Sequence, residues 1–432
     1  MDETKKGNGR KKTDKQTLGG KQMKKFLVSL VAVCFALLLA APSMAVDLSG
    51  HMRARGFSMA NPGLNADDQD SNAYYDTRVR MQAVVKPTDK ISLTFQADIF
   101  DGYKLGTVGP YAAATDSIDM DRAYITILSD YGKFDIGRMK GGAWGTAFGD
   151  YEGDFDRIKY TLPYSDKLTL VGIAQKSTEG DANTVKGSDQ DDDIIYLAGI
   201  YKLENGVAGL LGAYANYRST GTTDINKRVL VPYYKGKFGD LGIQAELIYE
   251  FGDIDRPEGT KDGDISGLSY NIEATYDIPG PFSFEAGYAF ASGDDTTDAN
   301  SEAGNTFYGG IGADWDKFVI FSDADCLLNS TGTTPVTQYG VKLWYLGAKY
   351  ALTEDISLWG NIGGATADQA GDAESDDYGI EFDVNMSWNL MDNLTYTMRL
   401  GFLNAGDLWK KINTVNEVDD TFTIYHKLQV DF

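Results

Sequence analysis

Thr421–Phe432, with the sequence TFTIYHKLQVDF, closes the chain with a regular alternation of apolar and polar side chains. One parity holds Phe422, Ile424, His426, Leu428, Val430 and Phe432, and the other holds Thr423, Tyr425, Lys427, Gln429 and Asp431. Successive side chains of a β-strand point to opposite faces, so this stretch predicts a strand with one apolar and one polar face. The apolar face would point inward in a soluble sandwich and outward, toward lipid, in a membrane barrel.

The same alternation recurs along the chain, most clearly over Tyr378–Leu390, and again over 91–99, 241–251 and 394–402. The polar faces carry too many charges for a packed core. Tyr378 and Trp388 stand near the two ends of one apolar face, as the aromatic girdles of membrane barrels require. We therefore predict an all-β, transmembrane, antiparallel up-and-down barrel, with a soluble β-sandwich as the alternative.

Short and long connections alternate strictly between these segments, as in barrels with short periplasmic turns and long external loops. Eight are short, namely 86–90, 129–133, 162–167, 203–206, 237–240, 278–281, 352–355 and 390–393. Nine are long, namely 58–73, 101–117, 139–156, 177–191, 219–227, 252–264, 292–337, 365–377 and 404–420. The count predicts 18 strands, or 16 if weak segments such as 356–364 merge with loops, and 305–321 is a candidate hairpin within the longest loop.

The chain carries an export signal near its beginning. A basic start at Met23 precedes the apolar run 26–41 and small residues up to Ala45. This predicts a cleaved signal peptide over 23–45, with an N-terminal membrane anchor as the alternative. Residues 1–22 are interpreted as a misassigned start, and 46–432 as a single barrel domain. The expected location is the outer membrane of a Gram-negative bacterium.

Charge and cysteine content exclude several classes of function. Residues 1–45 hold nine of the 40 Lys and Arg and three of the 63 Asp and Glu, so the remainder carries 31 against 60, a net charge of −29. This acidity argues against nucleic-acid binding. Only Cys326 remains beyond the signal segment, which precludes an internal disulfide. No cofactor or metal is expected.

Arginines concentrate on the polar faces early in the chain. Open sheet edges cannot exist in hydrocarbon, so the first strand, 46–57, must pair with the last. So many strands leave an aqueous lumen. We expect the lumen-facing arginines to line one wall, namely Arg53, Arg55, Arg78, Arg80 and Arg122. The alternative is that they only neutralise lumen acids such as Asp76 and Asp98.

Two adjoining segments, RAYITIL at 122–128 and YGKFDIGR at 131–138, resemble the signature of Gram-negative general porins. Segments 77–79 and 157–160 and the terminal Phe432 fit the same pattern. The resemblance implies that the third loop, 139–156, folds into the pore opposite Arg78 and Arg138, although Arg138 would need a bulge near Gly137 to face inward. The loop lacks the usual PEFGGD stretch and offers acids instead, namely Asp150, Glu152, Asp154 and Asp156. These acids could alternatively form a calcium-like cluster.

The resemblance further implies a water-filled channel for passive diffusion of ions and small hydrophilic solutes, selective through charge and pore diameter. It implies a homotrimer, contact with outer-membrane lipid, and Phe432 as a C-terminal signal for the barrel-assembly machinery. The acidic external loops could bind divalent ions that bridge lipopolysaccharide, or could simply stay solvated. The alternatives are a channel specific for sugars or carboxylates, and a structural or adhesive barrel plugged by 292–337. Enzymatic activity is not expected, because His51 and His426 fall on opposite faces of their strands.

Overall fold

The computed structural model describes residues 45–67, 70–106, 118–150, 153–180, 190–218, 223–294, 298–304, 315–322 and 338–432. The predicted start-site segment 1–22 and the signal peptide, except for Ala45, lie outside these ranges. So do Glu152 and residues 305–314 of the candidate hairpin.

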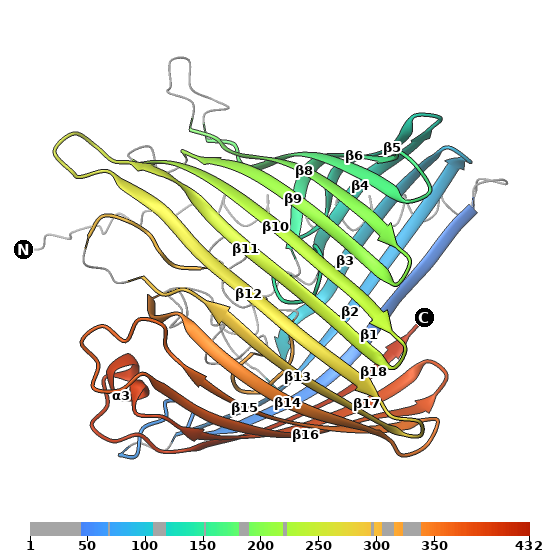
Figure 1. Ribbon diagram of the computed structural model, residues 1–432. Helices are drawn as coiled ribbons and strands as arrows, with labels where there is room; N and C mark the ends of the chain where they lie inside the picture. Colours follow the sequence, from blue (N-terminus) through green and yellow to red (C-terminus); the bar gives the residue numbers. More distant parts are fainter. Residues whose placement is uncertain are drawn as a thin grey trace, which may run out of the picture.

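Eighteen antiparallel strands in the described part of the chain form one closed sheet, as predicted (Figure 1). The strands are β1 (Ala45–Ala60), β2 (Ser71–Thr88), β3 (Ile91–Lys104), β4 (Asp119–Ser129), β5 (Gly132–Gly141), β6 (Gly153–Pro163), β7 (Leu168–Thr178), β8 (Asp192–Leu203), β9 (Gly206–Tyr217), β10 (Asp224–Phe238), β11 (Leu241–Asp255), β12 (Gly263–Asp277), β13 (Phe282–Ala291), β14 (Val341–Ala351), β15 (Ile356–Thr366), β16 (Asp377–Met391), β17 (Leu394–Ala405) and β18 (Thr421–Asp431). Every predicted short turn and long loop overlaps a connection between two of these strands, in the predicted order, although several of the predicted ranges extend into the strand ends.

The barrel closes where the first strand meets the last. β1 pairs with β2 on one side and with β18 on the other, in a register that runs from His51 opposite Asp431 to Ala60 opposite Phe422. The backbones of Gly50 and Phe432 exchange hydrogen bonds of 2.8 and 3.0 Å beyond the end of β18. Closure pairs both edge strands, so the sheet has no open edge to expose to lipid.

The two faces of the sheet differ as the sequence pattern predicts. On β16, Phe382 and Val384 are 48% and 62% exposed on the outside, whereas Glu381 and Asp383 are buried inside the barrel. On β18 the apolar parity is again exposed and Thr421 and Thr423 are buried. An apolar exterior around a polar interior is the arrangement that a bilayer requires.

Tyr378 departs from the predicted girdle. Trp388 lies on the outer face, but Tyr378 is fully buried and its hydroxyl donates a hydrogen bond to the Gly340 carbonyl, at 3.1 Å. The pairing of β15 with β16 shifts register next to Ala365, and Gly379 adopts a φ of 113°. This bulge reverses the parity of the strand end and turns Tyr378 into the barrel.

A short helix, α3 (Leu408–Asn413), lies in the last long loop and packs over Tyr378. The Trp409 indole donates its N–H to the Tyr378 carbonyl at 2.8 Å, and the two rings lie 5.4 Å apart. α3 therefore covers part of the barrel mouth on the loop side (Figure 1). None of the helices in the described ranges has the length and apolar character needed to cross a bilayer.

Candidate functional site

Basic side chains line the lumen face of three adjacent strands around the closure seam. This basic wall consists of Arg53 and Arg55 on β1, Arg78 and Arg80 on β2, and Lys427 on β18. Arg53 lies directly opposite Arg78, and Arg55 lies opposite Lys427. Like charges in directly opposed positions destabilise a sheet, so this arrangement requires compensation by other groups.

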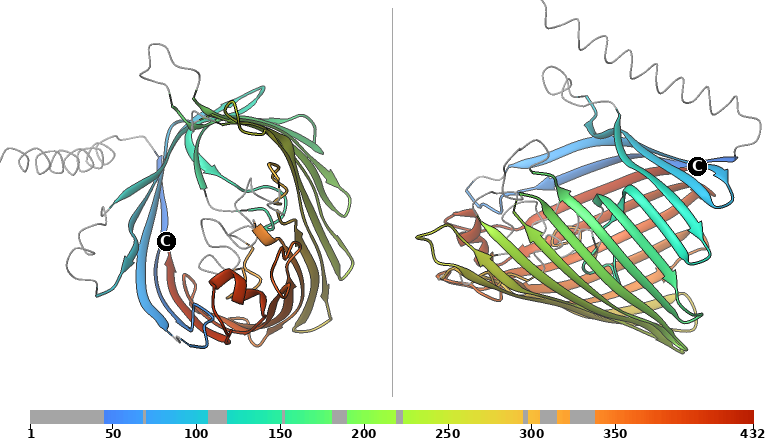
Figure 2. Two further views of the ribbon diagram at one scale, coloured as in Figure 1. Left: turned by 90° about the vertical axis from the view of Figure 1, so that its left-hand side faces the viewer. Right: turned by 90° about the horizontal axis from the view of Figure 1, so that it is seen from above.

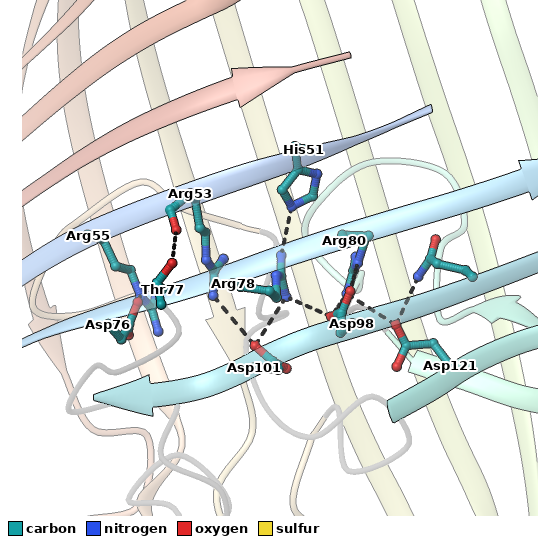
Figure 3. Close-up of polar contacts among 11 residues, drawn as sticks. His51, Arg53, Arg55, Asp76, Thr77, Arg78, Arg80, Asp98, Asp101 and Asp121 are labelled. Carbon is teal, nitrogen blue, oxygen red and sulfur yellow. Dashed lines mark hydrogen bonds and ion pairs between the residues drawn. The ribbon is translucent and has the colours of Figure 1, made fainter. Parts of the chain in front are cut away.

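Carboxylates interleave with the basic wall (Figure 3). Asp76 accepts a hydrogen bond from Arg55 at 2.7 Å, and Asp98 accepts from Arg80 at 2.7 Å. Asp101 on β3 lies 3.7 Å from Arg78 and 4.0 Å from Arg53, and Asp121 lies 3.8 Å from Arg80. The pairing with Asp76 and Asp98 that the alternative interpretation anticipated is therefore present in the geometry.

Compensation by these acids is incomplete. Five cations of the wall face four carboxylates, and the Nε–H groups of Arg53 and Arg78 are buried without a hydrogen-bond partner. Among the described residues, Lys427 forms no ion pair within 4 Å. These four acids thus leave one positive charge of the wall without a carboxylate of its own.

The third loop folds into the barrel, as expected. Its residues 142–150 reach the far wall, where the Trp144 indole N–H donates to the Val231 carbonyl on β10 at 3.0 Å. The Thr146 N–H donates to the Glu246 carboxylate on β11 at 2.6 Å. Asp150 accepts a bond from the Trp144 backbone N–H at 2.6 Å, which closes the loop on itself. Asp150 therefore stabilises the fold of the loop.

A second inward segment comes from the longest loop, between β13 and β14. Residues Trp315–Ser322, here named the inner segment, have the sequence WDKFVIFS, and their large apolar side chains are buried inside the barrel. The segment is not a strand, so the candidate hairpin at 305–321 is wrong for its described part. The run of four apolar residues, Phe318–Phe321, was the available signal, because an external acidic loop has no reason to carry it.

Two buried acids on β16 anchor the inner segment through its backbone. Glu381 accepts hydrogen bonds from the N–H groups of Ile320 and Phe321 at 2.6 and 2.7 Å. Asp383 accepts from the Val319 N–H at 3.0 Å. The carboxylates thus bind backbone donors that would otherwise be buried unpaired, at a cost of about 1–3 kcal/mol each.

Lys317 fixes the other side of the inner segment. Its ammonium group lies 2.6 Å from Glu273 and 3.1 Å from Glu285. Burial alone would lower the pKa of Lys317, but the charges and hydrogen bonds of Glu285 and Glu273 outweigh it and raise the pKa. Lys317 is therefore charged at neutral pH and holds the segment to β12 and β13.

The two inward segments meet inside the barrel (Figure 2). The ring of Phe148 in the third loop packs edge-on against Trp315, with the ring centroids 5.7 Å apart. Asp316 is the exposed residue of the inner segment and lies within electrostatic range of Lys427. Its carbonyl accepts a bond from Arg399 on β17 at 3.4 Å. A carboxylate therefore projects from the inner segment near the end of the basic wall.

Comparison with known proteins agrees with this geometry. The family model described as Gram-negative porin matches residues 27–399. The chain belongs to the Gram-negative porins. The family that the motif residues suggested is thus confirmed, and the protein is an outer-membrane porin that forms a channel for passive diffusion.

Several solved structures of Pseudomonas outer-membrane proteins are similar to this porin. OccK9 (OpdG) of Pseudomonas aeruginosa is 15% identical, with 90% of this chain and 98% of that chain covered and a TM-score of 0.56. OccK3 (OpdO) of the same organism is 12% identical, covers 89% and 96%, and scores 0.56. A BenF-like porin from Pseudomonas fluorescens Pf-5 is 12% identical, covers 89% and 99%, and scores 0.53. At these identities the likeness shows the fold. Comparison with curated proteins gave no match.

Two of the arginines that were predicted to line the pore, Arg122 and Arg138, lie on opposite faces of the sheet. Arg122 is on the lumen face and pairs with Asp154 at 2.5 Å. Arg138 is 47% exposed on the outer face, where it lies 3.4 Å from Asp156. β5 pairs with β4 and β6 without a register shift, so the bulge that Arg138 needed is absent and alternation keeps it beside Ile136. The expectation that Arg138 lines the pore is therefore wrong, because the parity of β5 keeps its side chain on the outer face.

The predicted loop acids also separate. Asp154 and Asp156 belong to β6, which begins at Gly153, and Glu152 lies outside the described residues. Within the ranges described, no three His, Cys, Asp or Glu side chains are grouped to hold a metal ion. An acid that the sequence did not predict, Asp316, lies in the lumen instead. Its position depends on how the longest loop folds back into the barrel.

The two histidines of the barrel lie on different faces. His51 Nε2 is 3.4 Å from Arg78 on the lumen side. The His426 ring packs edge-on against Tyr75, on the outer face, with the ring centroids 5.5 Å apart. The two imidazoles are thus separated by the sheet.

Proposed function

We propose that this porin admits small hydrophilic solutes through a passage that runs between the basic wall and the inner segment. The observation that carries the proposal is the residual positive charge on β1, β2 and β18 beside the exposed Asp316. Opposed charges at about 4 Å attract by roughly 1–4 kcal/mol in a watery or surface-like medium. Such a field orients a solute without trapping it, and charged groups on the wall set the ion preference.

Substitution of Arg78 tests the proposal, because Arg78 lies in the middle of the basic wall. Arg78→Glu changes the wall by two charges, so the reversal potential measured in planar bilayers under a KCl gradient should move toward cation preference by several-fold in permeability ratio. Arg138→Glu makes the same charge change on the outer face and serves as the matched control. Equal reversal potentials for the wild type and Arg78→Glu would place the passage elsewhere.

The partners of the porin complete the proposal. The export signal over 23–45 supports secretion and cleavage before assembly, and the exposed Phe432 at the free end of β18 supports recognition by the barrel-assembly machinery. A homotrimer is proposed from the family resemblance, and contact with lipopolysaccharide is proposed from the acidic external loops. Catalysis is not proposed, because the family is one of channels and the histidines lie on different faces.

A solute-specific channel is the second candidate. It is favoured by the lumen geometry, because two inward segments pack against each other through Phe148 and Trp315 and narrow the passage. A channel of this type should show a current that a particular solute blocks in a saturable way. A general porin should show ohmic steps that solutes of similar size reduce equally.

A further inference from the structure

A polar cavity of about 550 Å³ lies in the lumen beside the inner segment. It is formed by lumen-facing residues near the short-turn ends of β12 to β16, including Ser283, Glu285, Lys349, Ser357, Trp359 and Asn361. Its size lies within the range of small-molecule sites, about 300–1,000 Å³. A solute that has passed the inner segment on its way to the periplasm would enter this cavity.

Trp359 gives the cavity an aromatic surface whose polar atom is available. The indole N–H groups of Trp144 and Trp409 are bonded to backbone carbonyls, at 3.0 and 2.8 Å. Trp359, on β15, is half-buried and forms no hydrogen bond or ring contact with any described residue. An indole left open toward water combines an apolar face with a free hydrogen-bond donor.

Fixed polar groups stand beside this ring. The Asn361 amide donates to the Lys317 carbonyl at 2.6 Å, and Glu285 pairs with the Lys317 ammonium. Both side chains meet above Gly347 on β14, where an added Cβ would lie 2.6 Å from Asn361 Oδ1 and 2.7 Å from Glu285 Cγ. The inner segment and Gly347 together therefore hold the carboxylate and amide in place.

The two carboxylates that line the cavity, Asp277 and Glu285, are each paired with a lysine. Lys317 is paired with Glu273 and Glu285, and Lys237 is paired with Asp277 at 2.7 Å. Lys349 is the one lysine in the cavity lining. Acids and lysines are thus mixed around the cavity, so it has no concentration of one sign of charge like that of the basic wall.

We propose that this cavity is a binding site for neutral sugars on the periplasmic side of the constriction. A pyranose ring has an apolar C–H face that fits an aromatic ring, and a rim of hydroxyl groups that both donate and accept hydrogen bonds. Trp359 offers the ring, and Asn361, Glu285, Lys349 and the serine hydroxyls offer partners for the rim. The proposal rests on the channel function and adds the class of solute that pauses there.

Current block by maltotriose tests the site. Maltotriose is added to wild-type channels in planar bilayers, and a saturable decrease in ionic current is expected. Trp359→Ala should raise the half-blocking concentration by roughly tenfold, since a ring contact and a hydrogen bond are lost. Trp359→Phe should give a half-blocking concentration between those of the wild type and Trp359→Ala. Trp388→Ala removes an indole from the outer face of neighbouring β16 and should leave the block unchanged.

Titration calorimetry of the detergent-solubilised porin with maltotriose separates this site from the channel function. Binding in wild type that weakens in Trp359→Ala supports the site whether or not current is seen. Ohmic steps without block or binding heat would overturn the sugar site and leave the channel intact. Glucuronate that binds more tightly than glucose would contradict the neutral character of the site, and so would an undiminished block in Trp359→Ala.

Discussion

Removal of the Glu381 carboxylate should release the inner segment from the wall of the barrel. Glu381→Ala deletes the acceptor for two backbone N–H groups, those of Ile320 and Phe321, and leaves both donors buried. A backbone donor that is left buried without a partner costs about 1–3 kcal/mol, so two of them cost about 2–6 kcal/mol. Glu381 and Asp383 are neighbouring buried carboxyl groups, and removal of one of them relieves part of the cost of burying the pair, which brings the expected loss toward about 2–4 kcal/mol.

A loss of this size changes the docked population strongly, because each 1.4 kcal/mol is a factor of ten. We expect larger and noisier single-channel currents from Glu381→Ala in planar bilayers. Limited proteolysis should also cut near residues 315–322 faster than in the wild type. Asp383→Asn keeps a neutral acceptor for the single Val319 N–H and should give a smaller change in both measurements.

Wild-type conductance and protease resistance in Glu381→Ala would contradict the docking role of this side chain. That result would mean that the apolar contacts of Phe318 and Phe321 hold the segment without the carboxylates. A collapse of the heat-resistant electrophoretic band would instead show that Glu381 is needed for the barrel itself, and would contradict a role confined to the segment.

Three further perturbations follow from the structure. The pKa of Lys317 is raised from 10.5, so its contribution to docking of the inner segment is fully present below pH 10.5 and is lost as the pH rises through the raised value. Conductance should therefore stay constant from neutral to mildly alkaline pH and rise above it, whereas Lys317→Met should raise the conductance at neutral pH. Trp409→Ala leaves a cavity at a fully buried position near the loop-side mouth, at a cost of about 3–5 kcal/mol. It should speed proteolysis within 406–420 without unfolding the barrel, and cleavage at the wild-type rate would argue against the packing of α3. Deletion of Phe432 removes the exposed terminal aromatic and should lower the yield of assembled porin in outer-membrane fractions, and an undiminished yield would remove its assigned role as an assembly signal.

The number and order of the strands could be predicted from the sequence, because the side chains of barrel strands alternate with a period of two and every second connection is a short turn. Alternation over 378–390 and 421–432 identified the outward face correctly at residues such as Phe382 and Leu428. The exceptions are local. Tyr378 is turned inward by the bulge at Gly379, which leaves no trace in the alternation of side chains.

The site was accessible only in part. Strand parity placed Arg53, Arg78 and Arg122 on the lumen face, but the ion pairs among β1, β2 and β3 depend on register, which periodicity does not specify. The inner segment depends on the tertiary path of the longest loop, so Asp316 was not predicted. Arg138 shows the reverse case, in which a family motif suggested the lumen and the parity of β5 placed the side chain outside.

A water-filled lumen along the basic wall is the central feature of this porin, and thiol labelling tests it directly. In a Cys326→Ser background, Lys427→Cys places a thiol on the lumen face and Phe382→Cys places one on the outer face. A charged, membrane-impermeant thiol reagent applied to the reconstituted porin should modify Lys427→Cys and change its current, and should leave Phe382→Cys unmodified. Rapid modification of Phe382→Cys with protection of Lys427→Cys would contradict the account.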